Sequence, residues 1–344
     1  MRKLWISSAL VCLMFTSVGS DAGNRQLDIH WVDVEGGAAT LIVTPAGESI
    51  LVDTGWPDER GAPRVAKVAK AIGLQQIDHL ITSHWHTDHF GGHARLAELL
   101  PVKNWYDHGF PELPKNDITP ALVEAYRKAT GGKSIVLKPG DTIPLKQTRG
   151  APRLSLQVVA GHGIVSGEKP DAPQTRPCDK GHAAKHDDPS DNARSLAFVL
   201  KFGDWKFFNA GDLTWNVEHK LVCPTNLVGE VDLYQVTHHG ADNSNHPAVL
   251  AALQPRVAVM NNGPKKGGVA ASVQTIKATK SVEGFFAVHR NVNTGPADNA
   301  DPTHTANEAE QCTAETIKLA VAVDGKSYTV TVPRKATIKT FKTK

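Results

Sequence analysis

Three histidines and an aspartate fall within the six positions from His84 to His89, and these residue types are suited to metal chemistry. The pattern His84-x-His86-x-Asp88-His89 follows an apolar run, Ile77 to Ile81, which is typical of a buried strand that ends in a polar loop. Neutral imidazole and carboxylate are ligands that a zinc-like ion prefers, and a catalytic site uses about three of them and keeps one position for water. With this spacing, His84 and His86 can face one ion while Asp88 and His89 face a second.

Other polar side chains also stand where an apolar run ends. The run from Lys206 to Ala210 predicts a strand that delivers Gly211-Asp212, and the two carboxylate oxygens of Asp212 can each take one cation. A further predicted strand, Glu230 to Thr237, ends in the pair His238-His239. Asp53 follows the run Ser49 to Val52, where a carboxylate can hold a ligand histidine through its free ring nitrogen.

The His84 to His89 motif resembles the signature of the metallo-β-lactamase-fold hydrolases. The segments Asp33-Val34-Glu35-Gly36-Gly37 and Ile50-Leu51-Val52-Asp53-Thr54-Gly55 resemble the branch found in the hydrolase domain of DNA-uptake competence proteins. The resemblance implies an α/β fold, an αββα sandwich with one or two metal ions at its open edge. It also implies that Asp212 bridges the metals, that Asp53 supports a ligand without binding metal, and that His238 or His239 completes the second site. The spacing does not decide between these two histidines.

One position departs from the pattern of the family. A third histidine is expected between the main motif and the Gly-Asp strand, but Asp191 and Asn192 stand there, and His162 is the histidine at a strand end in this interval. Asp191, Asn192 or His162 is therefore the expected third ligand of the first site. Oxygen ligands shift the preference toward Mn or Mg, although zinc remains the first expectation for the remaining ligand set.

The N-terminal pattern, the length and the charge of the chain indicate its cellular compartment and its number of domains. Arg2 and Lys3 precede an apolar stretch and then small residues up to Ser20 or Ala22, so residues 1–22 are predicted to be a signal peptide, which implies a periplasmic or extracellular protein. Residues 23–344 are predicted to form a single domain with an exposed polar insertion at about 163–192. The net charge of +3 does not by itself indicate a nucleic-acid or membrane partner.

Cysteines and lysines leave several alternatives open. Cys178, Cys223 and Cys312 remain after the predicted signal peptide, which allows one disulfide and one free thiol without revealing the pairing. Lys265 and Lys266 lie in a glycine-rich loop that could bind an anionic substrate or be a solvated turn. The basic residues between Arg334 and Lys344 are expected to form a solvated tail.

These features favour a secreted metal-dependent hydrolase in which metal-activated water attacks a phosphoryl or acyl centre. Asp88 is expected to orient this water or accept its proton, besides binding metal. The resemblance favours a phosphodiester substrate, with nucleic acid or a choline-type phosphodiester as examples; a lactone or other ester comes second and a β-lactam third. The alternatives are a metal-binding module without turnover and a partner in DNA uptake, the latter resting on the resemblance alone.

Overall fold

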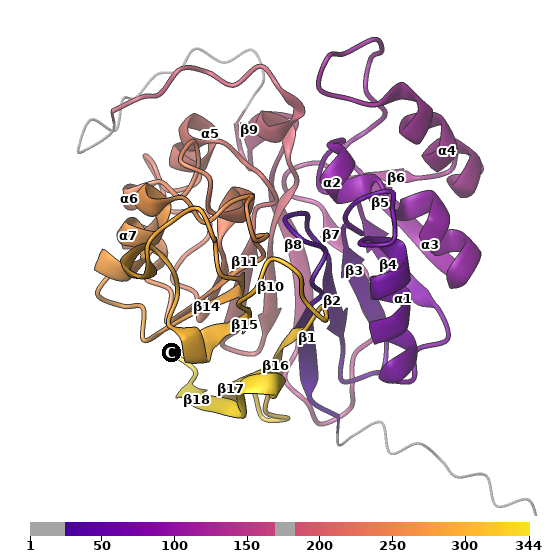
Figure 1. The fold of residues 1–344 in the computed structure, drawn as a ribbon. Coiled ribbons are helices and arrows are strands. Elements are labelled where there is room, and N and C mark those ends of the chain that lie inside the picture. Colours follow the sequence, from indigo (N-terminus) through magenta and orange to yellow (C-terminus); the bar gives the residue numbers. More distant parts are fainter. Residues whose placement is uncertain (1–24, 169–182) are drawn as a thin grey trace, which may run out of the picture.

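The computed structural model describes residues 25–168 and 183–344, so the predicted signal peptide lies outside the described residues. Two mixed β-sheets lie face to face, and helices cover the outer face of each (Figure 1). Both sheets follow the order of the chain through most of their width, because consecutive strands are joined either by tight turns or by helical crossovers.

The first sheet has the strand order β18-β17-β16-β1-β2-β3-β4-β5-β6. Pairing is antiparallel from β18 to β3 and parallel from β3 to β6. Its strands are β1 (Leu27–Trp31), β2 (Thr40–Val43), β3 (Ser49–Val52), β4 (Ile77–Ile81), β5 (Val102–Asp107), β6 (Ile135–Val136), β16 (Ile317–Val321), β17 (Ser327–Val332) and β18 (Thr337–Lys342).

The second sheet has the order β15-β14-β13-β12-β11-β10-β8-β7, and β9 pairs with β8. It is parallel from β11 to β15, whereas β10 pairs antiparallel with both β8 and β11. Its strands are β7 (Thr142–Ile143), β8 (Leu154–Gly161), β9 (Ile164–Val165), β10 (Ala197–Phe202), β11 (Trp205–Asn209), β12 (Leu233–Gln235), β13 (Val257–Met260), β14 (Gly284–His289) and β15 (Thr305–Asn307).

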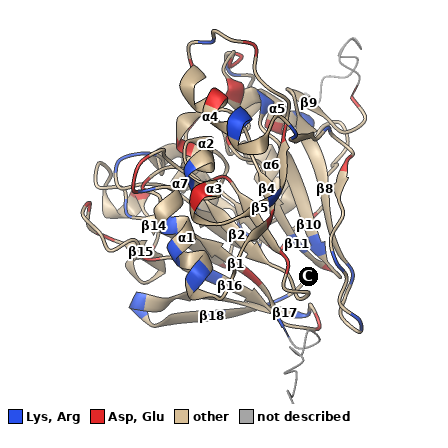
Figure 2. Ribbon diagram, turned by 90° about the vertical axis from the view of Figure 1, so that its right-hand side faces the viewer, with Lys and Arg blue, Asp and Glu red and all other residues tan. Residues whose placement is uncertain are grey.

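Helices form the outer layers. Those beside the first sheet are α1 (Ala62–Ala71), α2 (Thr87–Phe90), α3 (His93–Leu99) and α4 (Pro120–Thr130), and those beside the second are α5 (Trp215–Lys220), α6 (Pro247–Leu253) and α7 (Ala270–Ala278). The side view in Figure 2 shows both basic and acidic residues on the outer helices, as expected for faces turned to water. None of the helices in residues 25–168 and 183–344 has the length and apolar character needed to span a membrane.

Three apolar clusters correspond to the three interfaces between the four layers. The central cluster joins both sheets, with Ile29 and Ile50 from the first and Phe198 and Phe207 from the second. The two others lie between each sheet and its own helices. This layering confirms the expected αββα sandwich, because each sheet buries both faces and each helix buries one.

Two expectations about elements are wrong. The predicted basic tail is strand β18, which pairs along its length with β17 and buries Phe341 while its lysines stay at the surface. The strand expected from Glu230 to Thr237 is only Leu233–Gln235, because the chain turns at His238 and His239, both at φ 52°. A left-handed backbone conformation cannot continue a strand.

The polar insertion is only partly described, since residues 169–182 and with them Cys178 lie outside the described residues. Its last residues differ from expectation, because Asp191 and Asn192 form a buried 3-10 turn instead of an exposed loop. Cys223 is disulfide-bonded, and Cys312 is the free cysteine in the described part of the chain.

Candidate metal centre

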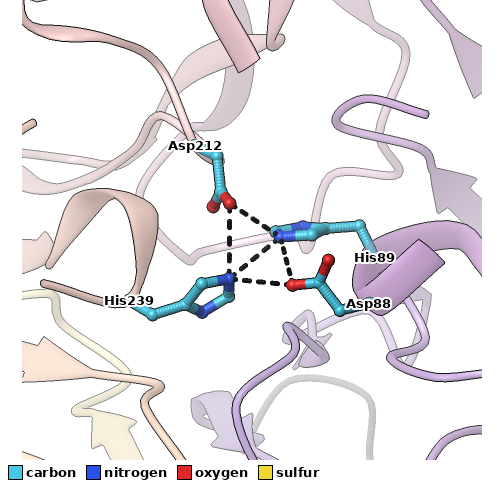
Figure 3. Close-up of side chains that lie close together, drawn as sticks. All are labelled: Asp88, His89, Asp212 and His239. Atoms are coloured by element: carbon cyan, nitrogen blue, oxygen red, sulfur yellow. Dashed lines mark hydrogen bonds and ion pairs between the residues drawn. The ribbon is translucent and has the colours of Figure 1, made fainter. Parts of the chain in front are cut away.

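Four acidic and histidine side chains meet where the two sheets adjoin. Ligand atoms of Asp88, His89, Asp212 and His239 all lie within 4.8 Å of one another, and all four residues are buried (Figure 3). Nε2 of His89 lies 3.0 Å from Nε2 of His239 and 3.1 Å from Oδ2 of Asp212. Nε2 of His239 lies 3.3 Å from Oδ2 of Asp88.

Each side chain belongs to the segment that follows the end of a strand. Asp88 and His89 belong to the short helix α2, which follows β4 of the first sheet. Asp212 follows β11 and His239 follows β12, so these two side chains come from the second sheet. The Leu196 amide donates to the Ser83 carbonyl at 2.9 Å and thus ties the two halves together beside the site. The cluster therefore exists only when both sheets are packed together.

The helix that carries Asp88 and His89 is held by close backbone contacts. The Ala38 amide donates to the Asp88 carbonyl at 3.1 Å, and the Thr54 amide donates to the His89 carbonyl at 2.8 Å. Gly91 allows the chain to pass close to the next segment, because a Cβ there would lie only 2.8 Å from the Pro57 nitrogen. Gly91 thus lets the end of the helix pack closely against the segment at Pro57.

The orientation of the imidazole rings suits a cation. His89 is held through Nδ1 by Asp53 Oδ2 at 2.8 Å, and His239 through Nδ1 by the Asn261 carbonyl at 3.0 Å. An oxygen that only accepts fixes a proton on Nδ1 of each ring, so both Nε2 atoms face the centre. Two ring nitrogens 3.0 Å apart beside two carboxylates need a cation between them, either a proton, in line with the raised pKa of His89, or a metal ion in its place. The donor set therefore fits a divalent metal ion.

The other three predicted ligands adjoin this cluster. The His84 ring lies 4.1 Å from the His89 ring and 4.6 Å from the His86 ring, between centroids. Oδ2 of Asp212 is 3.4 Å from Nε2 of His238 and 3.9 Å from Nε2 of His84. Nε2 of His84 is buried without a hydrogen-bond partner, as expected for a ligand atom. Asp212 thus faces both groups of histidines, the placement that a bridging carboxylate requires.

His239 and His238 differ in their surroundings. His239 belongs to the four-residue cluster, whereas His238 touches the centre through Asp212 and contacts Ser244 Oγ through Nδ1 at 3.3 Å. The sequence does not decide which of the two histidines is a metal ligand, and the structure brings both to the site.

The three candidates for the missing third ligand lie outside the four-residue cluster. Oδ2 of Asp191 accepts from the Trp85 amide at 2.7 Å and lies 2.9 Å from Nε2 of His108. His162 Nε2 donates to the Leu137 carbonyl at 3.2 Å. Asn192 is buried in the same 3-10 turn as Asp191.

Sequence reasoning missed two residues near His86. Asp117 Oδ2 lies 3.0 Å from His86 Nε2 and accepts from the Asp191 amide at 2.7 Å. His108 contacts Asp191 directly. His108 stands just past the end of strand β5, the same signal that marks the other candidates, and could have been found by it. Asp117 lies in an irregular loop with no such signal.

The charges in the centre are strongly coupled. Burial opposes ionisation of Asp88 and Asp212, yet the neighbouring His89 and His239 hold the pKa of both carboxyls well below the usual range. Burial likewise opposes the charge on His89, but Asp212, Asp88 and Asp53 hold its pKa well above the usual range. Paired charges of this kind in a buried site are typical of functional centres.

The two lysines of the glycine-rich loop have different partners. Lys266 Nζ pairs with Asp88 Oδ2 and lies 5.1 Å from the centre of the Trp56 ring. Lys265 Nζ pairs with Glu310 at the surface. Only Lys266 of this pair thus reaches the centre.

Comparison with known proteins identifies the domain. The family model described as the metallo-β-lactamase superfamily matches residues 32–168, which include the His84 to His89 motif. Residues 32–168 belong to the metallo-β-lactamase superfamily. The sandwich is the metallo-β-lactamase fold, as the resemblance implied. Proteins of this superfamily are generally metal-dependent hydrolases, and the His/Asp cluster is one that could hold a divalent ion of unassigned identity.

Two curated relatives extend the match beyond the metallo-β-lactamase domain model. ComE operon protein 3 of Bacillus subtilis (strain 168) is 23% identical over 282 residues, which cover 76% of this chain and 32% of the relative. Recombination protein 2 of Haemophilus influenzae is 25% identical over 241 residues, covering 68% of this chain and 24% of the relative. The chain thus spans about a third or less of these proteins. The solved structure of Tm1679, titled a metal-dependent hydrolase of the beta-lactamase superfamily, has a TM-score of 0.42 at 15% identity, with coverage of 76% and 95%.

Proposed function

We propose that the protein is a metal-dependent hydrolase that acts on a phosphodiester or another ester. The observation that carries this proposal is the meeting of Asp88, His89, Asp212 and His239, with the other three predicted ligands beside them. A non-catalytic metal-binding module needs ligands only, whereas this centre also combines a bridging carboxylate with the partly exposed cation Lys266.

In this proposal His84, His86, Asp88, His89, Asp212, His238 and His239 hold one or two divalent ions, zinc first and manganese second. When bound, the ions supply Lewis acidity toward water and the substrate oxygen. Oδ2 of Asp88 lies toward His239 and Lys266, and in this proposal the Asp88 carboxylate would orient the attacking water and accept its proton. Asp53, Asn261 and Ser244 fix the rings through Nδ1 and so keep Nε2 directed at the centre.

The position of Lys266 is an argument for an anionic substrate. Its side chain is 40% exposed while the carboxylate of Asp88 is 9% exposed, so the lysine reaches into the centre from the surface. A flexible ammonium group of this kind can leave Asp88 and pair with a charged phosphodiester oxygen, which a neutral lactone does not offer. The order of substrates in the proposal is therefore phosphodiester, with nucleic acid as one example, and then lactone or other ester. The β-lactam comes third because the third histidine expected in the first site is missing.

The test is turnover by the full chain loaded with Zn²⁺ or Mn²⁺ against four chromogenic substrates: bis(p-nitrophenyl) phosphate, p-nitrophenyl acetate, a thiolactone and a β-lactam. We expect the phosphodiester to give the highest kcat/KM, and Asp212→Asn to lower it by at least about 100-fold, as for loss of a group that stabilises transition-state charge. Absence of turnover on all four by metal-loaded protein would favour the binding module.

Matched lysine variants separate the substrate class from the chemistry. Lys266→Gln is expected to lower kcat/KM for the phosphodiester by about 10-fold or more and to affect the neutral ester less, because only the first carries a charge. Lys265→Gln is the control, since Lys265 pairs with Glu310 instead of Asp88. Equal effects of Lys266→Gln on both substrates would contradict an anionic substrate.

We also propose that the protein is exported to the periplasm or beyond, on the basis of the signal-like residues 1–22 and the disulfide at Cys223. Expression of the full chain with analysis of intact mass tests this. We expect loss of a mass corresponding to cleavage near Ser20 or Ala22 in the exported fraction. A full-length protein that stays in the cytosol would contradict export.

A further inference from the structure

A second group of potential ligands lies outside the candidate metal centre. Asp33 follows β1, His289 ends β14, and Cys312 lies in the connection between β15 and β16. Asp33 and His289 are fully buried, and Cys312 is partly exposed. One ligand atom from each residue lies within 4.8 Å of the others.

The three side chains bring their donor atoms close together. Nε2 of His289 is 2.8 Å from Oδ1 of Asp33 and 3.9 Å from Sγ of Cys312, and this sulfur is 3.1 Å from the other oxygen of Asp33, Oδ2. Bond lengths of about 2.0–2.3 Å and tetrahedral angles place the ligands of a zinc ion about 3.3–3.6 Å apart. The observed spacings bracket this range, so small side-chain shifts would bring all three atoms to one ion.

A Cys-His-Asp catalytic triad does not fit these contacts. A triad uses both ring nitrogens, one toward the nucleophile and the other toward the carboxylate. Here Asp33 and Cys312 both approach the same nitrogen, Nε2 of His289. Burial and then Asp33 raise the pKa of the Cys312 thiol to about 12, which is the opposite of nucleophile activation. Convergence of three donors on one point is instead the geometry of a metal site.

We propose that Asp33, His289 and Cys312 form a second zinc-type site, separate from the candidate metal centre and distinguished from it by a thiolate ligand. Binding forms the Zn–S bond and breaks the S–H bond, and the proton leaves to solvent. The thiolate and the Asp33 carboxylate together balance the charge of a divalent ion. Arg64 pairs both with Glu35 and with Oδ2 of Asp33, at 3.3 Å from the latter, so Glu35 would balance the guanidinium once Asp33 binds the ion. The partly exposed Cys312 leaves room for water as the fourth ligand.

A metal here would link three distant parts of the chain near the candidate metal centre. The segment after Asp33 continues to Gly36, where a Cβ would lie 2.8 Å from Cβ of Lys266, and to Ala38, whose amide donates to the Asp88 carbonyl. His289 is joined to Asn262, since its amide donates to Asn262 Oδ1 at 3.1 Å. We infer a structural role, in which the second ion fixes the backbone that supports Asp88 and the loop carrying Lys266.

Cobalt(II) as a probe for zinc tests the site directly. The full chain, stripped of metal and kept oxidised so that the disulfide at Cys223 stays intact, is titrated with Co²⁺. Thiolate-to-cobalt charge transfer absorbs in the near ultraviolet, and the candidate metal centre contains only nitrogen and oxygen ligands. Because Co²⁺ also binds at the candidate metal centre, we expect the band to saturate at the intensity of one thiolate-bound cobalt per chain, whatever the total uptake. It should be displaced by Zn²⁺ and disappear in Cys312→Ser.

Two further variants separate this proposal from the proposed function. Asp212→Asn is expected to keep the charge-transfer band at wild-type intensity while hydrolysis is lost, and His289→Gln is expected to weaken cobalt binding at the band by about 10-fold or more. Absence of the band in wild-type protein saturated with cobalt would overturn the second site, whether or not the variants fold. Persistence of the band in folded Cys312→Ser would also overturn it, since the sulfur ligand would then lie elsewhere.

Discussion

At the scale of single residues, Asp53 shows how much of the centre depends on groups that would not touch a metal. Its carboxylate accepts from the Ser83 amide at 2.8 Å and from Ser83 Oγ at 2.6 Å, and it also holds His89 Nδ1. Asp53 itself has φ 61°, a left-handed conformation that aspartate and asparagine tolerate better than most residues. One side chain therefore fixes both the start of the motif and the ring of a predicted ligand.

Asp53→Asn is expected to weaken Zn²⁺ binding at the candidate metal centre by about 10–100-fold, the usual effect of losing the partner of a ligand histidine. Asparagine keeps the size and the left-handed backbone, so the fold should persist. Calorimetric titration with Zn²⁺ measures the change. The control is Asp58→Asn, an exposed aspartate that pairs with Arg60. Equal affinity in Asp53→Asn and wild type would mean that Asp53 has only a structural role.

Glu218 makes the free energy of unfolding depend on pH. It is fully buried, accepts from the His246 amide at 2.9 Å, and burial raises its pKa from 4.5 to about 7. A raised folded-state pKa means that the native state binds more protons than the unfolded state between these values, so the free energy of unfolding falls as pH rises from 4.5 to 7. The full loss amounts to about 3 kcal/mol above pH 7.

Glu218→Gln should abolish this pH dependence, because the amide is neutral at every pH. Urea unfolding at pH 5 and pH 8 is the measurement. We expect the wild type to lose about 2.5 kcal/mol more than the variant between these two values, because part of the loss has already occurred at pH 5. Glu124→Gln on the outer face of α4 is the control, with an exposed carboxylate. Parallel pH profiles for wild type and Glu218→Gln would show that Glu218 is charged in the native state.

At the scale of elements, the candidate ligands lie in turns that follow strands, and glycines allow these turns to pack closely together. The turn at His239 packs against the loop from Gly263 to Gly268, where the Gly268 amide donates to the His239 carbonyl at 2.7 Å. Gly267 has φ +75°, and a Cβ added there would lie 2.2 Å from the same carbonyl oxygen. The position of His239 therefore depends on the absence of a side chain in another element.

Gly267→Ala is expected to destabilise the protein by about 3 kcal/mol and to weaken metal binding, because the turn that carries His239 must move. Gly73→Ala is a matched control: Gly73 has φ +85° but no atom within 4 Å of an added Cβ, so only the backbone cost of about 1 kcal/mol applies. Chemical unfolding and zinc titration of both variants provide the comparison. Equal losses of stability would show that the contact with His239 is unimportant.

At the scale of the whole molecule, one buried amide joins the two sheets. Gln235 of β12 accepts at Oε1 from Trp31 Nε1 at 2.9 Å and from Thr40 Oγ1 at 2.8 Å, and these donors belong to β1 and β2 of the other sheet. This polar contact fixes how the sheets lie on each other, and the candidate metal centre spans the same two sheets.

Gln235→Leu is expected to lower the free energy of unfolding by about 2 kcal/mol or more, because two buried donors lose their acceptor. Urea denaturation measures the loss. Gln157→Leu is the control, because Gln157 is exposed on β8 and should change stability by less than about 0.5 kcal/mol. A neutral effect of Gln235→Leu would mean that water or a rearranged Thr40 replaces the amide.

Elements whose residues carry a local signal are predictable from the amino-acid pattern alone. The strands that precede His84 and Asp212 follow from apolar runs, and the structure has both within a residue of the prediction. A ligand motif at a strand end is equally local, so His84 to His89, Asp212 and the pair His238-His239 can be picked out without tertiary information. Periodicity suffices here because each pattern lies within a single element.

Contacts between elements, in contrast, follow only from the tertiary packing. Asp33 and His289 are 256 positions apart, and Asp117 reaches His86 from an irregular loop, so neither contact has a periodic signal. The turn at His239 ends a strand earlier than its apolar pattern suggests, and β18 forms because the first sheet offers an edge to a segment predicted to be a polar tail. The physical reason is the same throughout: local patterns fix an element, whereas its partners depend on how two sheets pack.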